Sequence, residues 1–384
     1  MSTPAKVDTT LANSDVVSKY KAAAEVTNSA LGKVFAACKE GAKVLDLCKL
    51  GDAAIEVGVE AQFRKNKKLS KGVAYPTSVS VNAIVCHFAP GDSDPLGEQQ
   101  LAQGDVVRVQ LGAQIDGYAA VAGQTLVVGA SAERPVTGKA ADALTAAHYA
   151  GEAMQRLLKP GNKNMAATER VQRVAKAYEC KPIENIVCHE QKQNDLDGDK
   201  QIILNPGTDQ RSKFPSCEFA PYEVYLVDIY VTTGDGRVRQ SEQRTNIFKK
   251  TATKYQLKTK AGRATYNEIA HKFSNFPFTI RSCDDERKTR MGLIECTKTT
   301  VVQAFDIQEE KPGEVVGQVT FTALVTPNGV ERITQGPAFD PNVIRSDKVI
   351  SDTDLVELLQ TSPKIKKKAG KKTGEKSGDK AASS

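Results

Sequence analysis

The chain repeats one arrangement of two helices separated by a glycine break, and this internal repeat limits the folds open to it. Hydrophobic residues recur with helical spacing in the first segment, and the other three are also read as helices. The breaks are alike, since 39–43 and 159–163 both have the pattern Lys-x-Gly-x-Lys. The four predicted helical segments are 14–38, 43–63, 138–158 and 166–178.

A strand-like motif follows each pair of helices. Ala83–His87 and Asn185–His189 share the residues Ile-Val-Cys-His. A four-residue identity alone could be chance, but here it follows the same order of helices. We interpret the repeat as an ancestral duplication that gives two αβ halves, with equivalent strands facing a shared central cleft.

Further strands have clear turn signals. The stretch 104–129 reads as two apolar strands joined at Asp116-Gly117, and Gln110 is a lone amide in the first of them. Tyr222–Val231 reads as a buried strand with Asp228 in its middle. A second hairpin is predicted over 315–325, turned at Pro327-Asn328-Gly329. Residues 251–305 are more polar and helix-like, and we expect them to form an inserted lobe.

These elements predict an α+β protein with one main body. We expect a flexible N-terminus over 1–13 and a single domain over 14–362 that carries the inserted lobe at about 251–305. The segment 363–384 is a low-complexity run of lysine, glycine and serine, and we expect it to be disordered when free.

Composition points to a reducing compartment. The chain has no basic region followed by an apolar run at its N-terminus and no apolar segment of about 18 residues. Its eight cysteines are scattered without a Cys-x-x-Cys pair, which argues against a disulfide scaffold. We therefore expect the cytoplasm and the nucleus as locations, and no membrane association.

The positive charge is unevenly distributed. Net charge is +7, and the segment 363–384 holds eight lysines against two acidic residues, which leaves +1 for the rest of the chain. Two further basic runs lie at 64–71 and 244–263, the second without an acidic residue. One short run is usually only a solvated surface, but three runs favour a polyanionic partner. The candidate nucleic-acid-binding residues are Arg64, Lys65, Lys67, Lys68, Lys71, Arg244, Lys249, Lys250, Lys254, Lys258, Lys260, Arg263, Lys364, Lys366, Lys367, Lys368, Lys371 and Lys372.

The mode of recognition is also constrained. The chain has no zinc-finger, RNP or KH signature and no tryptophan, so stacking readout of single-stranded bases is unsupported. Contact with the nucleic-acid backbone through shape and charge is preferred.

Nearly the whole chain resembles a known family. The stretches AYPTSVSVNAIVCHFAP, VQLGAQIDGY, KPIENIVCHEQKQ, EVYLVDIYVTTGDG, RMGLIEC and TPNGVERITQGP carry the resemblance. They are similar to the proliferation-associated or ErbB-receptor-binding proteins, whose fungal relative is a curved-DNA-binding protein. This is the non-peptidase branch of the type II methionine aminopeptidase superfamily. The resemblance implies the pita-bread fold, with pseudo-two-fold αβ halves.

The resemblance also identifies what became of the metal site. The two aspartates that bind metal ions in the aminopeptidases align with Gln110 and Val121. The metal-binding histidine aligns with His189, the two glutamates align with Asp228 and Thr320, and the substrate-contacting histidine aligns with His87. A dinuclear site needs several anionic ligands around two ions about 3.5–4 Å apart. One imidazole and one carboxylate remain, so we expect no metal, no cofactor and no enzymatic activity.

Two Cys-His pairs raise the question of other chemical sites. Cys86-His87 and Cys188-His189 could form one zinc site or a Cys-His nucleophile pair, but adjacent residues of a strand point to opposite faces. Buried structural cysteines are the preferred interpretation. Asp228 is then a hydrogen-bonded remnant and Gln110 a buried amide bonded to its neighbours. An active metallo-aminopeptidase with altered ligands remains the alternative.

The branch implies a function in translation. Its members associate with ribosomes near the nascent-chain exit tunnel and with ribonucleoprotein particles, so we expect structured RNA, most concretely ribosomal RNA, as the partner. Roles in ribosome-associated translation, ribosome biogenesis or growth regulation follow from it. DNA could bind through the same charge, protein partners stay open, and we expect a monomer found in cytoplasm and nucleus, including the nucleolus.

Overall fold

A central antiparallel sheet organises the molecule. The structure is a computed structural model that describes residues 8–364. Its main path runs β1-β3-β4-β14-β8-β6-β7, with β15 paired to β14 and β5 paired to β8. The strands are β1 (Lys71–Val81), β3 (Val106–Ile115), β4 (Tyr118–Val127), β5 (Lys181–Pro182), β6 (Val187–Gln191), β7 (Gln201–Ile203), β8 (Val224–Thr232), β14 (Val316–Thr326) and β15 (Gly329–Arg332).

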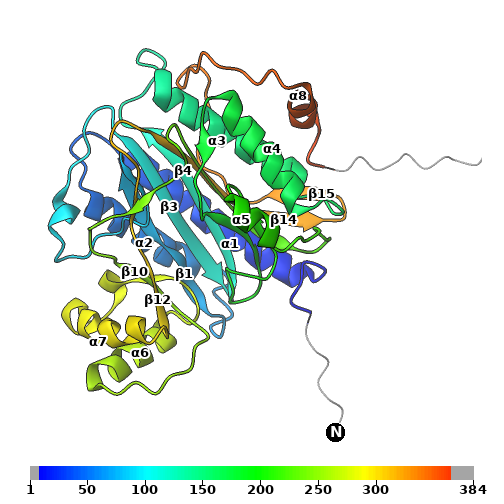
Figure 1. Ribbon diagram of the computed structural model, residues 1–384. Helices are drawn as coiled ribbons and strands as arrows, with labels where there is room; N and C mark the ends of the chain where they lie inside the picture. Colours follow the sequence, from blue (N-terminus) through cyan, green and yellow to red (C-terminus); the bar gives the residue numbers. More distant parts are fainter. Residues whose placement is uncertain (1–7, 365–384) are drawn as a thin grey trace, which may run out of the picture.

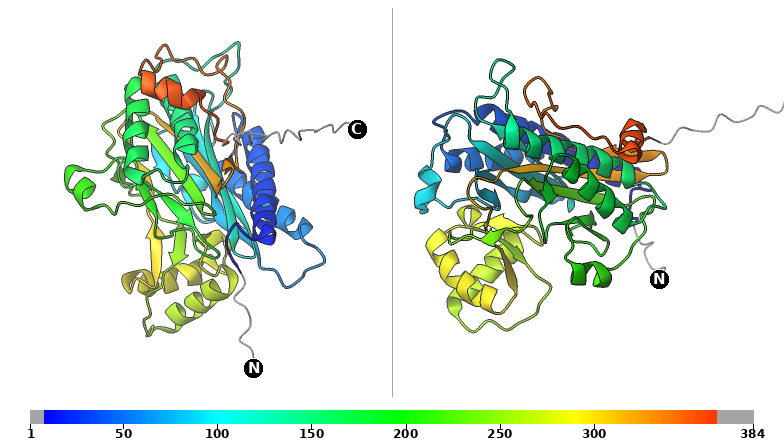
Figure 2. Two further views of the ribbon diagram at one scale, coloured as in Figure 1. Left: turned by 90° about the vertical axis from the view of Figure 1, so that its right-hand side faces the viewer. Right: turned by 45° about the horizontal axis from the view of Figure 1, so that its top comes forward.

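Four helices cover one face of this sheet (Figures 1 and 2). Alternate side chains of each strand point towards these helices and form the core. Val109 of β3 packs beneath α1 and α2, and Val227 of β8 packs beneath α3 and α4. The intervening residues, such as Gln110 and Asp228, point to the opposite face. The helices are α1 (Ser14–Ala37), α2 (Val44–Ala61), α3 (Gly138–Leu157) and α4 (Asn164–Ala177).

The two helix breaks have the same geometry. Gly41 and Gly161 both have positive φ, 81° and 90°, which favours glycine at both positions. The Gly41 amide donates to Leu101 O at 2.8 Å, and the Gly161 amide donates to Phe219 O at 3.0 Å. The predicted repeat of helix pairs therefore extends to the hydrogen bonds of their connections.

The repeated Ile-Val-Cys-His motif does not occupy equivalent places, and that part of the prediction is wrong. The second copy lies in β6 of the central sheet, where it pairs with β8. The first copy forms β2 (Ile84–Cys86), which pairs with β13 (Gln308–Glu309) in a separate sheet. The strand that holds the position of β6 in the first half is β1, which pairs with β3.

The small sheet that contains β2 is fixed by a buried arginine. Its order is β2-β13-β9, with β9 (Arg239–Gln240) at one edge. Arg108 of β3 is 1% exposed and donates to the carbonyl oxygens of Asn82, Ile84, Val85 and Val316. Burial lowers the pKa of Arg108 to about 10.

The inserted lobe has a core of its own. It begins with β10 (Ile247–Lys250) and adds a three-stranded sheet, β11-β10-β12, to the helices that the sequence predicts. These strands are too short for a period-two pattern to reveal them. The other lobe elements are α6 (Lys260–Lys272), β11 (Phe278–Thr279), α7 (Glu286–Lys298) and β12 (Val302–Phe305). Figure 1 shows the lobe beside the edge of the main body near β1.

Ion pairs join the lobe to the body. Arg281 is bonded to Asp52 at 2.6 Å, and both side chains are largely buried. Arg290 is bonded to Asp94 at 3.1 Å, and Asp94 also accepts from Asn246 at 2.6 Å. Breaking a buried pair leaves an uncompensated charge, so these contacts favour one arrangement of the lobe.

The ordered body extends beyond both predicted limits. Leu11, expected in a flexible segment, is 6% exposed and packs with Tyr20 and Tyr118. At the other end, Pro363 O accepts from the Val330 amide at 3.1 Å, so the body continues past residue 362. Two helices complete the described part, α5 (Thr208–Lys213) and α8 (Thr353–Gln360), and no helix within residues 8–364 is long and apolar enough to cross a membrane.

Candidate functional site

Three of the five positions that align with the metal ligands lie in one row across the sheet. Gln110 of β3 lies opposite Gly123 of β4, Gly123 lies opposite Thr320 of β14, and Thr320 lies opposite Asp228 of β8. All four therefore face the side of the sheet that the helices leave uncovered. Glycine is needed in this row, because a Cβ at Gly123 would lie 2.8 Å from Gln318 Nε2 and 2.9 Å from Thr320 Oγ1.

A neutral hydrogen-bond network connects the row. Gln110 Oε1 accepts from Tyr230 at 2.8 Å and from Gln318 Nε2 at 3.1 Å. Gln318 Nε2 also lies 2.9 Å from Thr320 Oγ1, and Thr320 donates to Asp228. Gln110 is thus a buried amide bonded to its neighbours, as expected.

Asp228 is the acid of this network. Burial raises its pKa from 3.8 to about 6, although hydrogen bonds from Thr320, Gln318 and Gln110 favour the charged form. No basic side chain is bonded to Asp228 within the described residues. Its carboxylate is stabilised by polar neighbours rather than by a cation.

Two histidines line the cleft from different parts of the chain. His189 of β6 lies opposite Leu226 of β8, and Leu226 is two residues from Asp228 on β8. The Nδ1 atom of His189 is buried without a partner in the described part of the chain. His87 Nδ1 lies 2.9 Å from Asp306 O, and its ring packs edge-on against Phe305. Burial lowers the pKa of both imidazoles, which favours their neutral forms.

Val121 belongs to an apolar cluster behind the wall of the cleft. It is fully buried and packs with Tyr75, Leu226 and Ile247. Its backbone amide donates to Thr322 Oγ1 at 2.9 Å, which ties β4 to β14 at this position. Valine has no donor atom for a metal.

The residues present do not fit a dinuclear metal site. His189 and Asp228 are the two ligand-type groups left at the five aligned positions, while Gln110 and Thr320 are engaged in the network. Among residues 8–364, no group of three or more His, Cys, Asp or Glu is arranged to hold a metal ion. Losses of surrounding contacts alone typically cost about 10–100-fold in metal affinity.

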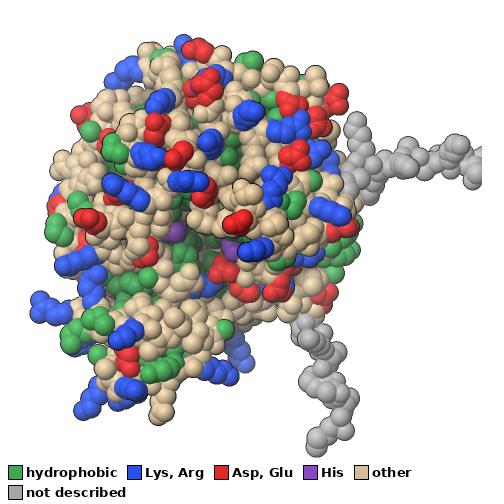
Figure 3. All heavy atoms as spheres, in the orientation of Figure 1, with side chains coloured by type: hydrophobic (Ala, Val, Ile, Leu, Met, Phe, Trp, Pro, Cys, Tyr) green, Lys and Arg blue, Asp and Glu red, His purple; other side chains and the backbone are tan. Residues whose placement is uncertain are grey.

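The row opens into a cavity of about 530 Å³. His87, Gln110, His189 and Asp228 line it together, whereas Val121 and Thr320 lie behind its wall. Figure 3 looks into the hollow between lobe and body, where histidine side chains are visible. Tyr75, Tyr230 and Gln318 are site residues that sequence analysis missed. The sequence did contain a signal for two of them. Tyr230 is two residues from Asp228, Gln318 is two residues from Thr320, and side chains two residues apart on a strand point to the same face.

The cysteines beside the histidines are structural. Cys86 and Cys188 are buried, and all eight cysteines are free thiols. The Asp228 amide donates to Cys188 Sγ at 3.3 Å, which ties β6 to β8. Burial raises the pKa of the Cys188 thiol to about 12, so the thiolate that nucleophilic chemistry requires is disfavoured.

The first basic run lies at the end of α2. Arg64, Lys65, Lys67 and Lys68 are exposed, and none of them has an ion-pair partner in residues 8–364. Lys71 is half-buried and donates to Gln62 O at 2.6 Å. Lys71 also lines a groove of about 640 Å³ with Lys272 and Phe273 of the lobe, so this run ends beside the lobe.

The second run belongs to the lobe and its entry, with one exception. Lys249 is 8% exposed and forms an ion pair with Asp197, so among the predicted nucleic-acid contacts of this run it is the buried and paired one. The buried amino group is already neutralised. Arg263 is exposed but donates to Leu257 O and Lys258 O. Within this run, the exposed or half-buried cations without an ion-pair partner among residues 8–364 are Arg244, Lys250, Lys254, Lys258, Lys260 and Arg263. Arg287 and Lys298 of α7 are also exposed and have no ion-pair partner in that range, and the sequence analysis did not include them.

Charge separates by region once the lobe is delimited. Residues 247–305 hold 12 basic and five acidic residues, a net charge of +7. The body, residues 1–246 and 306–362, holds 33 basic and 39 acidic residues, a net charge of −6. Blue side chains rim the lobe in Figure 3. The near-neutral total for residues 1–362 therefore conceals a cationic lobe on an acidic body.

The C-terminal lysines fall mostly outside the described residues. Lys364 is described and forms an isolated bridge with Gly329. Lys366, Lys367, Lys368, Lys371 and Lys372 lie outside residues 8–364. Their part in nucleic-acid binding stays a prediction.

Comparison with known proteins identifies relatives along the whole body. The profile of metallopeptidase family M24 matches residues 18–211. The curved DNA-binding protein of Schizosaccharomyces pombe is 40% identical over 362 residues, which cover 94% of each protein. ERBB-3 binding protein 1 of Solanum tuberosum is 40% identical over 365 residues, covering 94% of this chain and 91% of that protein. The structure of a thermophilic Arx1 matches with a TM-score of 0.86 at 31% identity, covering 92% of this chain and 100% of that one.

Proposed function

The chain belongs to metallopeptidase family M24, in the branch of the curved DNA-binding and ErbB-3-binding proteins, and from this membership we propose that it is a non-enzymatic member that binds structured RNA. The family and its pita-bread fold are those that the sequence predicted. Ribosomal RNA is the most concrete partner, with binding near the nascent-chain exit tunnel and a role in ribosome-associated translation, ribosome biogenesis or growth regulation.

The observation that carries the proposal is the cationic lobe. A net charge of +7 within residues 247–305, next to a body of −6, gives the molecule one face for a polyanion. Lys250, Lys254 and Lys258 have no ion-pair partner among residues 8–364, so RNA phosphates would not have to displace a carboxylate. These cations lie on or beside an ordered lobe, which lowers the entropy cost of docking.

Charge reversal tests the proposal. We expect Lys250→Glu, Lys254→Glu, Lys258→Glu and Lys260→Glu together to weaken co-sedimentation with ribosomes at moderate salt. The matched control reverses four exposed lysines of the body, Lys33, Lys39, Lys176 and Lys213. Equal loss of binding in both variants would show that only net charge matters, and unchanged binding by the lobe variant would refute the proposal.

The absence of peptidase activity is the second part of the proposal. It is supported by Val121, which has no donor atom, and by the use of Gln110 and Thr320 in the neutral network. We expect purified protein supplied with cobalt, manganese or zinc to release no methionine from Met-initiated peptides above a blank.

An active metallo-aminopeptidase with altered ligands is the alternative. The persistence of His189, Asp228 and His87 in one cavity favours it. Stoichiometric metal in the purified protein, with methionine release abolished by His189→Ala and Asp228→Ala, would establish it and overturn our proposal.

DNA is a further candidate partner. One relative is named a curved DNA-binding protein, and the same lobe cations could contact a DNA backbone. Competition between ribosomal RNA and bent duplex DNA for the same protein would rank the two.

For the location we propose cytoplasm and nucleus, including the nucleolus. For the assembly state we propose a monomer, which gel filtration would test.

A further inference from the structure

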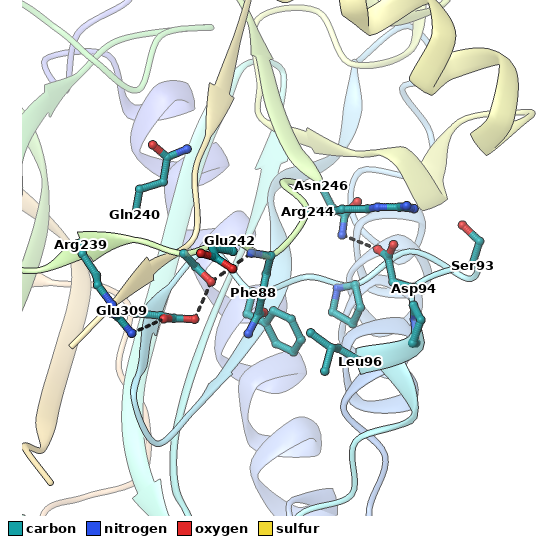
Figure 4. A pocket seen from close by; sticks show the side chains of 14 residues that line it. Phe88, Ser93, Asp94, Leu96, Arg239, Gln240, Glu242, Arg244, Asn246 and Glu309 are labelled. Carbon is teal, nitrogen blue, oxygen red and sulfur yellow. Dashed lines mark hydrogen bonds and ion pairs between the residues drawn. The ribbon is translucent and has the colours of Figure 1, made fainter. Parts of the chain in front are cut away.

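A second large groove lies at the root of the lobe. It has a volume of about 840 Å³ and shares no lining residue with the cleft. The loop 88–96 forms one wall, and β9 with the connection 241–246 forms the other (Figure 4). The groove shares Arg244 with the second basic run, but the lobe lysines of the RNA proposal and the residues of the remnant cleft do not line it.

The floor of the groove is apolar and the rim is charged with both signs. Phe88, Pro90, Pro95 and Leu96 supply the floor, and Leu96 is 43% exposed. Figure 4 shows Arg239 with Glu309 on one side and Arg244 near Asp94 on the other. Arg239 is bonded to Glu309 at 3.4 Å. The groove holds two arginines against Asp94, Glu242 and Glu309, so it does not attract a polyanion.

The wall formed by β9 has an unused backbone edge. Ser241 donates its amide to Ile307 O at 2.8 Å, and Gln240 lies opposite Gln308. In an antiparallel ladder, this places Gln240 at a position whose amide and carbonyl point away from the partner strand. No other group among the described residues bonds to them. β9 is the last strand of its sheet, and such an edge accepts a further strand.

A buried acceptor beside this edge also lacks a partner. Gln243 Oε1 is inaccessible to solvent and unbonded within residues 8–364. Because the Gln243 side chain also lines the groove, a rotation of its amide would bring this acceptor to a ligand N–H. The opposite wall is already fixed, because Asp94 accepts from the Gly91 amide at 2.8 Å and from Asn246 at 2.6 Å.

We propose that this groove binds an extended peptide segment of a partner protein. The segment pairs with the amide and carbonyl of Gln240 as an added strand, and it places one apolar side chain on the floor between Phe88 and Leu96. A peptide supplies the alternating donors and acceptors that the edge requires, as well as the N–H that Gln243 lacks. An RNA supplies phosphates, which the three carboxylates of the rim oppose.

The test uses the full chain and a defined probe. Random ten-residue peptides displayed on phage are selected against the protein, and the selected peptides are synthesised and measured by fluorescence anisotropy. Gln240→Pro removes an amide that makes no ladder bond, so the sheet stays paired while strand addition is blocked. We expect it to weaken binding about tenfold, the value of one good hydrogen bond. Leu96→Asp should weaken binding at least as much.

Matched controls separate the peptide from other causes. Gln240→Ala keeps the amide and removes the exposed side chain, so it should bind within about twofold of wild type. If Gln240→Pro impairs folding, N-methylation of the peptide at the pairing position removes the same kind of bond without changing the protein. Peptides that bind equally well to the proline, aspartate and wild-type proteins would overturn the proposal, as would a failure to select any peptide. If Gln240→Pro and Leu96→Asp weaken the binding of ribosomal RNA but not of peptides, the groove is an RNA site instead.

Discussion

At the residue scale, Gln110 shows how the cleft is bonded where the aligned position carries an amide in place of a carboxylate. Its amide oxygen accepts two hydrogen bonds, from Tyr230 and Gln318, where an aspartate would have brought a negative charge. With Val121 and Thr320 also neutral, Asp228 is the one carboxylate in the row, and no cation is needed to balance several buried anions.

The raised pKa of Asp228 gives a prediction about stability. The folded state binds this proton with a pKa of about 6, against 3.8 for the ordinary carboxyl, so this group stabilises the fold as pH falls from 7 towards 4. Asp228→Asn has no such proton. Between pH 7.5 and pH 5, we expect the free energy of unfolding of the wild type to rise by about 1 kcal/mol more than that of the variant. Urea unfolding at both pH values measures this, and equal changes in the two proteins would contradict it.

At the scale of elements, the pair of helix breaks could be read from the sequence because glycine at a left-handed position leaves a local signal. Gly41 and Gly161 are that signal, and the structure places them alike. The Ile-Val-Cys-His repeat misled because four shared residues say nothing about which sheet a strand joins. The burial of Lys249 could not be predicted either, since its partner Asp197 is 52 residues away. Contacts between distant residues leave no periodic pattern.

The equivalence of the breaks can be measured. Neither glycine has a neighbour that would clash with a Cβ, since the nearest atom at Gly161 lies 4.0 Å away and none lies within 4 Å at Gly41. Alanine there therefore costs only the left-handed backbone strain. We expect Gly41→Ala and Gly161→Ala each to lower the free energy of unfolding by about 1 kcal/mol. Denaturant unfolding of both variants is the measurement, and costs that differ by more than about 1 kcal/mol would argue against equivalent breaks.

At the scale of the whole molecule, many hydrogen bonds and packing contacts join the two halves. Val121 O accepts from Thr322 and from Thr334, and Thr125 exchanges hydrogen bonds with the backbone of Gln318. Tyr20 and Tyr118 pack with Leu324 across the same seam. A cut between the halves would leave these buried groups unsatisfied.

We therefore expect a single cooperative unfolding transition for the body. Far-ultraviolet circular dichroism and tyrosine fluorescence should give the same midpoint in urea. Limited proteolysis should not release a folded fragment that ends near residue 130. A stable fragment of that length, with its own unfolding transition, would mean that the halves are separate domains.

The separate charges of the lobe and of residues 363–384 predict how RNA binding depends on salt concentration. Binding that neutralises Z phosphates weakens with salt at a slope of about −0.9Z in log–log form for a duplex. Residues 363–384 carry eight lysines and two acidic residues, so deleting them should flatten the slope and weaken binding to all RNAs alike. The reversal of Lys250, Lys254, Lys258 and Lys260 should weaken binding more. Ordered cations match one RNA shape at a lower entropy cost than cations of a low-complexity segment.

Filter binding of ribosomal RNA at several salt concentrations separates the two contributions. The lobe variant should lose preference among RNAs of different shape, whereas the deletion should keep it. If the deletion abolishes binding while the lobe variant binds as the wild type does, the lysine-rich segment is the binder and the lobe is not. The charge of +7 on residues 247–305 would then need another explanation, and an acidic protein surface would be the first candidate to examine.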